Sequence, residues 1–146
     1  DEASEYIGRL FHVINDLERV GDHALNLVQR TESCVEKGLL YSEAARKEIT
    51  DIYESSLLLF DCAMGAFLNG ELSDDDELRL HDLEENIDRL TLESQDNHII
   101  RLRAKECHTE PGIIFVKVLH DLERVGDHSY NIAWAAKQHA NLLREV

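Results

Sequence analysis

A repeated acidic motif contains the residues of this chain whose types and spacing best suit chemistry. The string DLERVGDH occupies residues 16–23 and recurs unchanged at 121–128. A weaker relative of it, HDLEENID, occupies residues 81–88. In every copy a Glu is followed four residues later by an Asp. Eight identical residues in a row do not recur by chance in so short a chain, so the repeat indicates a duplication kept by a shared constraint.

The Glu and Asp of each copy are expected to lie on one face of a helix, at the edge of its buried stripe. Positions i and i+4 are neighbours about 5–6 Å apart, and two carboxylates placed there repel each other. A divalent or trivalent cation turns this repulsion into ligation, because hard cations prefer carboxylate oxygens. The candidate metal ligands are three acidic pairs, namely Glu18 with Asp22, Glu84 with Asp88, and Glu123 with Asp127.

The residues alone leave alternatives open for these acids and for the histidines near them. In so acidic a chain, the pairs also suit a solvated face, although their repetition favours ligation. His81 and His120 each precede the motif Glu by three residues and offer nitrogen ligands for iron, zinc or manganese. An exposed polar histidine is nevertheless the favoured interpretation of both.

The other motif positions have mainly structural interpretations. The two motif glycines, Gly21 and Gly126, are interpreted as packing glycines that let neighbouring helices approach closely, despite about 1 kcal/mol of lost helix propensity each. Each motif arginine is expected to pair with the Asp three residues before it, Arg19 with Asp16 and Arg124 with Asp121. The motif ends are either donors that orient carboxylates or ordinary helix-surface residues, namely His23, Asn26, His128 and Asn131.

Four amphipathic segments are available to position the motif copies. Their apolar residues recur at three- and four-residue steps, and no segment alternates as a strand does, so we expect an all-α fold. Breaks near 37–38, 69–70 and 109–112 are short, which implies an antiparallel helical bundle of four long helices. The four predicted seams run from Ile7 to Val28, from Ala45 to Phe67, from Leu80 to Leu90 and from Phe115 to Ala136.

A metal site shared by the third and fourth helices fixes where the third helix must end. The fourth helix rises about 1.5 Å per residue from Pro111, which places Glu123 about 18 Å from the turn. If the third helix ends near Leu102, Asp88 stands about 21 Å from the same turn, level with Glu123 within one helical turn. We therefore predict that Arg103–Glu110 is an irregular loop, although its residues tolerate a helix.

Composition narrows the classes of function. Lys and Arg number 15 against 30 Asp and Glu, and the formal net charge of −15 repels nucleic acid and attracts cations or basic partners. The three cysteines are widely spaced and form no CxxC, so neither a zinc knuckle nor a disulfide framework is indicated. No transmembrane helix or signal peptide is apparent. The start at Asp1, inside a predicted helix, suggests a piece of a longer protein.

The motif resembles the signature helix of PhoU-like domains, LERIGDHxxNIA. Here it reads LERVGDHALNL and LERVGDHSYNIA. The segment HIIRLRAKECHTEPGIIFVKVLHDLERVGDHSYNIAW is more similar to the cytoplasmic PhoU-like tail of bacterial sodium/phosphate cotransporters than to free-standing PhoU. The similarity covers the whole chain, strongly in the first and fourth helices and loosely in the second and third.

The resemblance implies two tandem three-helix bundles, each with E/DxxxD motifs that bind iron or other metals on the bundle surface. Residues 1–38 then correspond to the last helix of an incomplete first bundle, and residues 39–146 to a complete three-helix bundle. Carried over by position, the motif acids are the six candidate ligands given above. Glu18 and Asp22 are expected to lack their partner helix, so only the second bundle is expected to hold a complete site.

The expected function is a metal-binding regulatory domain of phosphate transport or phosphate homeostasis, as the cytoplasmic part of a sodium/phosphate cotransporter. Iron is the favoured metal, with zinc or manganese as alternatives, and no catalytic or organic cofactor-binding residue is predicted. Expected partners are the membrane domain of the transporter or proteins of the transport system. Nucleic acid is not an expected partner, and a homodimer is left open because the apolar seam of the first helix lacks bundle partners.

Three other functions are compared with this expectation, namely a free-standing regulator, a metal-free adaptor and an enzyme. The chain resembles free-standing PhoU-type cytosolic regulators as well, and a metal-free helical adaptor would use the acids only for solubility. A di-iron carboxylate enzyme in a four-helix bundle needs Glu-x-x-His on paired helices, and this chain contains no such sequence. We therefore do not expect an enzyme.

Overall fold

The protein is an antiparallel bundle of helices, seen in a computed structural model that describes residues 2–144 and the side chains of residues 3–137. The helices are α1 (Glu2–Glu36), α2 (Glu43–Asn69), α3 (Asp74–Arg103) and α4 (Thr109–Arg144). Between residues 2 and 144 there is no strand, so the all-α, four-helix prediction is confirmed. No helix in this range combines the length and hydropathy that crossing a bilayer requires.

The helix ends follow local capping chemistry. Ser42 and Ser73 have extended backbones, and each side-chain oxygen accepts a hydrogen bond from the backbone N–H three residues later, which caps the start of α2 and α3. Gly38 and Gly70 have φ angles of 62° and 69°, the left-handed conformation that glycine adopts most easily after a helix. The predicted breaks after α1 and α2 are therefore confirmed.

The loop between α3 and α4 lies where the register argument requires it. α3 ends at Arg103, residues 104–108 are not helical, and Lys105 has a φ angle of 59°. α4 begins at Thr109, shortly before Pro111, which its first turn accommodates because the N–H groups there need no helical partner. The predicted break is confirmed, although the loop is shorter at both ends than expected.

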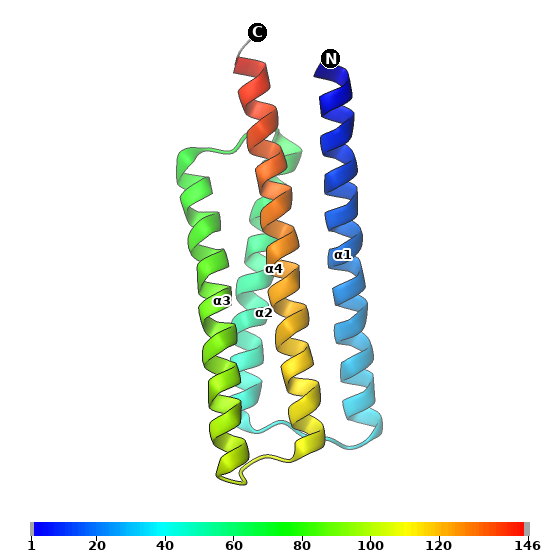
Figure 1. Ribbon diagram of the computed structural model, residues 1–146, viewed down its shortest axis with the longest axis vertical. Coiled ribbons are helices and arrows are strands. Elements are labelled where there is room, and N and C mark those ends of the chain that lie inside the picture. The colour runs from blue at the N-terminus through cyan, green and yellow to red at the C-terminus, as the bar shows by residue number, and fades with distance from the viewer. Residues whose placement is uncertain (1, 145–146) are drawn as a thin grey trace.

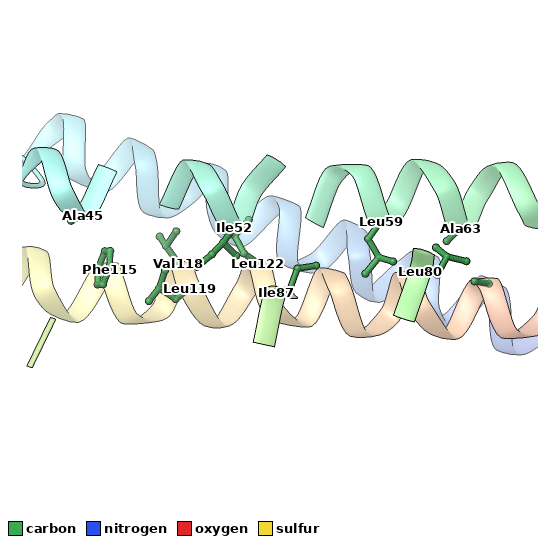
Figure 2. Close-up of a cluster of buried hydrophobic side chains, with 11 residues drawn as sticks. Ala45, Ile52, Leu59, Ala63, Leu80, Ile87, Phe115, Val118, Leu119 and Leu122 are labelled. Atoms are coloured by element: carbon green, nitrogen blue, oxygen red, sulfur yellow. The ribbon is translucent and has the colours of Figure 1, made fainter. Parts of the chain in front are cut away.

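The hydrophobic core lies among α2, α3 and α4. Ile52 and Leu59 of α2 and Leu119 of α4 are 0% exposed. Figure 2 shows them with neighbouring side chains from all three helices. The predicted seams of these helices are confirmed, and the remaining core members are Ala45, Ala63, Leu80, Ile87, Phe115, Val118, Leu122 and Ala133.

Among the described residues, α1 contacts α4 and no other helix, and the start of α1 lies at the same end of the bundle as the end of α4 (Figure 1). Val13 and Cys34 of α1 are buried, but Ile7, Ile14 and Val28 are 53%, 57% and 55% exposed. These exposed residues belong to the predicted apolar seam from Ile7 to Val28, which was expected to lack bundle partners. α1 is apolar on two faces, and α4 covers only one of them.

The two motif glycines have different surroundings. A Cβ on Gly126 would lie 3.2 Å from Cδ1 of Ile87 and 3.7 Å from Cδ2 of Leu59, so Gly126 is a packing glycine as predicted. A Cβ on Gly21 would meet nothing within 4 Å. The same interpretation of Gly21 is therefore wrong, because no helix packs on that face of α1.

The interface between α1 and α4 is built around Asp121, which is 2% exposed. Its carboxylate accepts hydrogen bonds from Nδ1 of His23 at 2.8 Å, Nδ2 of Asn26 at 3.2 Å and Nε of Arg30 at 2.6 Å. Burial alone raises the pKa of Asp121, but these bonds together hold it below its usual range. The carboxylate is therefore stable as an anion inside the interface.

A reciprocal set of bonds joins the same two helices through Asp16. Its carboxylate accepts from Nδ1 of His128 at 2.9 Å and from Nδ2 of Asn131 at 3.3 Å. The reciprocity arises because two identical motif copies cross antiparallel, so the first residue of each faces the end of the other. We call these two sets of bonds the α1–α4 clasp.

The clasp corrects the expected pairing of the motif arginines. Among the described residues, Arg19 does not pair with Asp16, and Arg124 pairs with Asp127 at 2.8 Å instead of with Asp121. Both aspartates are taken by the opposite helix. Of the two interpretations of the motif ends, orientation of carboxylates is the one that fits, but the carboxylates belong to the clasp.

Replacing Asp121 by Ala should lower the free energy of unfolding by about 2–3 kcal/mol, because it leaves Arg30 and His23 without their acceptor. This value lies below that of a fully buried pair because the side chain of Arg30 is 27% exposed. Asp16→Ala removes the two bonds from His128 and Asn131 and should lower the free energy of unfolding by about 1–1.5 kcal/mol. Urea denaturation at neutral pH measures both, and equal losses would contradict the assignment of Asp121 as the main anchor.

Gly21→Ala should raise the free energy of unfolding by about 1 kcal/mol, because Ala is a better helix former and its methyl group meets open space. Gly126→Ala should gain clearly less, or lose stability, because the buried Ile87 must move. Thermal unfolding of both variants tests this difference. Equal gains at the two glycines would show that α3 does not pack closely on Gly126.

Candidate metal centre

Close packing of α3 on α4 sets the level of the two acidic pairs. Because Gly126 has no side chain, Ile87 lies against the backbone of α4. Asp88 follows Ile87 and Asp127 follows Gly126, so the next residue on each helix is an acid at the same level. The two acidic pairs are therefore level, as a metal site shared by α3 and α4 requires.

Three carboxylates converge at this point. Oxygens of Glu84, Asp88 and Asp127 all lie within 4.8 Å of one another, and all three side chains are partly buried. Ligands on opposite sides of one cation are separated by about 4.0–5.2 Å, which is twice a metal–oxygen bond of about 2.0–2.6 Å. The three oxygens therefore fit the span of one ion. We call Glu84, Asp88, Asp127 and the adjacent Glu123 the acidic centre.

The electrostatics of the acidic centre differ from those of an ion pair. Partial burial raises the pKa of Glu84, and the charges of Asp88 and Asp127 raise it further. Burial and then the charge of Asp127 likewise raise the pKa of Asp88. In Asp121 the pKa moves the other way because cationic and neutral donors surround it. The centre thus keeps negative charges together at a cost that a cation would remove.

Glu123 stands at the edge of the centre. Burial raises its pKa, followed by the charges of Asp127 and Asp88, while His120 and Arg124 act in the opposite direction. Its oxygens are not within the 4.8 Å group. The structure therefore brings together three of the four predicted ligands on α3 and α4 and leaves Glu123 within electrostatic reach of them.

The predicted ligands on α1 are in a different environment. Glu18 and Asp22 are exposed, and no group of three ligands among the described residues includes either of them. Within residues 2–144, α4 is the only helix that contacts α1, and it meets α1 through the clasp on another face. The Glu–Asp pair of the motif thus lies against a partner helix in α4 and faces solvent in α1.

The two histidines near the motif acids do not join a group of three ligands among the described residues. His81 is 49% exposed, with Nε2 3.3 Å from Oε1 of Glu85. The ring of His120 packs edge-on against that of His23, with centroids 6.4 Å apart. The favoured interpretation, exposed polar histidines, fits both.

Arg124 contacts the acidic centre, although its sequence spacing predicted a pair with Asp121. Its Nη1 donates to Oδ2 of Asp127 at 2.8 Å, and its Nη2 lies 3.4 Å from Nε2 of His128. Arg124 is three residues from Asp127 and also three residues from Asp121, so spacing alone allows either pair. The capture of Asp121 by α1 decides between them.

Comparisons with known proteins place the chain in a family. The PhoU domain family matches residues 49–136, which include both acidic pairs of the centre. The chain is 28% identical over 127 residues to "Phosphate-specific transport system accessory protein PhoU homolog 1" of Thermotoga maritima, across 87% of this chain and 53% of that protein. It therefore spans about half the length of this relative, and no solved structure matches it significantly. The family match covers more than half of the chain, including the motif copies of α3 and α4 and most of the core that these helices form with α2, so the chain belongs to the PhoU domain family.

Proposed function

We propose that this chain is a metal-binding regulatory domain of phosphate transport or phosphate homeostasis, and that it works by binding rather than by catalysis. The observation that carries the proposal is the convergence of Glu84, Asp88 and Asp127 within 4.8 Å, with raised pKa values at Glu84 and Asp88. Membership of the PhoU domain family and the printed name of the Thermotoga maritima relative support the link to phosphate transport.

The donor set suits a hard metal ion. Carboxylate oxygens from Glu84, Asp88 and Asp127 would hold the ion, and Glu123 would join them after a change of rotamer. All-oxygen ligation suits iron or manganese, and zinc also accepts carboxylates. Iron is the favoured metal in this proposal, with manganese and zinc as alternatives. The ion would cancel the repulsion among the acids and so stiffen the contact between α3 and α4.

The proposed setting is the cytoplasmic part of a sodium/phosphate cotransporter, with the transporter's membrane domain or other transport-system proteins as partners. The support is the similarity of the segment around the second motif copy to such tails. A free-standing PhoU-type regulator also fits the curated relative. An immunoblot of fractionated source cells distinguishes them, because a cotransporter tail sediments with membranes and a free-standing regulator stays in the soluble fraction.

We also propose that residues 1–38 are the last helix of a first bundle and that residues 39–146 form the complete second bundle. In support, α1 contacts α4 alone, whereas α2, α3 and α4 all contact one another. The outer face of α1 includes the exposed side chains of Ile7, Phe11 and Ile14. A homodimer would cover the same apolar face, and sedimentation of the isolated chain would detect it.

Asp88→Asn combined with Asp127→Asn should lower metal affinity at least tenfold, on the order of the loss seen when a metal site is disturbed. Glu18→Gln combined with Asp22→Asn removes the same charge from the exposed motif copy and should change affinity little. Elemental analysis of protein purified without chelator or metal-affinity column, followed by titration with Fe²⁺, Mn²⁺ and Zn²⁺, measures both. Equal metal content in the unchanged chain and in the Asp88/Asp127 variant would refute the site assignment, and no metal in any of the three proteins would favour the metal-free adaptor.

Glu84→Gln should stabilise the metal-free chain at neutral pH by about 0.5 kcal/mol, because it removes like-charge repulsion. Because the pKa of Glu84 is raised in the folded state, the free energy of unfolding of the unchanged chain falls as pH rises through that pKa. Below about pH 4 the carboxyl is protonated in both the folded and the unfolded chain, so the stabilisation by Glu84→Gln should vanish there. Thermal unfolding with chelator at the two pH values measures it. A loss of stability at neutral pH would show that Glu84 has a structural role instead.

A further inference from the structure

Arg124 is the one Lys or Arg among the described residues that forms an ion pair with a member of the acidic centre. Its guanidinium holds Oδ2 of Asp127 at 2.8 Å, and the two side chains are 42% and 32% exposed. This arginine therefore places a positive charge beside one of the three converging carboxylates. It therefore occupies one of the two oxygens that Asp127 can offer to a metal ion.

The same guanidinium touches a second group, on the side of α4 that faces α1. Nη2 of Arg124 lies 3.4 Å from Nε2 of His128, whose Nδ1 is 2.9 Å from Oδ1 of Asp16. A neutral imidazole has one donor and one acceptor nitrogen, so His128 can donate to Asp16 and accept from Arg124 at the same time. An unbroken path of contacts thus leads from Asp127 to α1.

Metal binding and this path compete for the negative charge of Asp127. A cation on Asp127 and the guanidinium of Arg124 would be two positive charges competing for one carboxylate. The guanidinium is a rigid planar fork, so Nη1 cannot leave Asp127 without moving Nη2 away from His128. Displacement of Arg124 would therefore remove a donor from His128 and weaken the hold of His128 on Asp16.

We propose that Arg124 is a displaceable counter-cation of the acidic centre, which holds Asp127 when metal is absent and reports metal occupancy to α1 through His128 and Asp16. This inference rests on the proposed metal binding and specifies how the same centre is regulated. Metal entry would release Arg124 and loosen one half of the α1–α4 clasp.

The matched test compares Arg124→Gln with Arg89→Gln. Arg89 follows the candidate ligand Asp88, but its guanidinium binds Glu93 and Asn86, so its loss removes the same charge without freeing an oxygen of the centre. Titration with Fe²⁺, Mn²⁺ or Zn²⁺ should show about three- to tenfold tighter binding in Arg124→Gln and a change within about twofold in Arg89→Gln. Weaker binding in Arg124→Gln would mean that the arginine only positions Asp127, and would overturn the proposal.

A metal-free measurement separates this proposal from the proposed function. With chelator present, the thermal midpoints of Arg124→Gln, Asp127→Asn and the double variant form a cycle. The double variant should shift the midpoint by less than the two single shifts combined, because both remove one ion pair. Additive shifts would overturn the proposal. If neither the unchanged chain nor Arg124→Gln binds metal, the proposed function fails, and the counter-cation role of Arg124 fails with it. If the unchanged chain binds metal and Arg124→Gln binds it more weakly, only the counter-cation role is refuted.

Hydrogen exchange tests the report to α1. Metal should speed amide exchange of α1 around Asp16 in the unchanged chain, because His128 loses its donor. In Arg124→Gln that donor is already absent, so metal should leave exchange there unchanged while still binding. Identical exchange of α1 with and without metal in the unchanged chain would overturn the path through His128.

Discussion

The close approach of Ile87 to the backbone of α4 at Gly126 is the contact on which the rest of the structure depends. It costs about 1 kcal/mol of helix propensity at the glycine, and it brings Asp88 and Asp127 to the same level. α3 and α4 run antiparallel and are joined by a short loop, residues 104–108. The acidic centre is therefore a consequence of helix packing more than of any single carboxylate.

The motif residues of α4 point to three different neighbours, which are the core, α3 and α1. Leu122 and Gly126 face the core, Glu123 and Asp127 face α3, and Asp121 with the end of the motif faces α1. These uses impose opposite electrostatic conditions within one short segment. Asp121 is held as an anion by donors from α1, whereas Glu123 is crowded by other acids. Arg124 lies between the two environments and contacts both Asp127 and His128.

Sequence periodicity predicted what depends on one helix at a time. The breaks after α1 and α2 and the loop before α4 depend on local sequence, and helix rise gave the approximate level of the acidic pairs. Partner choice was not predictable in the same way. Arg124 is equally spaced from two aspartates, and Gly21 has the same flanking sequence as Gly126 but no neighbour. Such differences depend on which helix lies alongside, which a single motif does not encode.

Anomalous diffraction from crystals of the chain soaked in Mn²⁺ or Fe²⁺ tests the central claim most directly. The account predicts one strong peak between α3 and α4, about 2.0–2.6 Å from carboxylate oxygens of Glu84, Asp88 and Asp127. The same map should show Arg124 withdrawn from Asp127. A map without a peak at the acidic centre, or with metal bound only at the exposed Glu18 and Asp22, would contradict it.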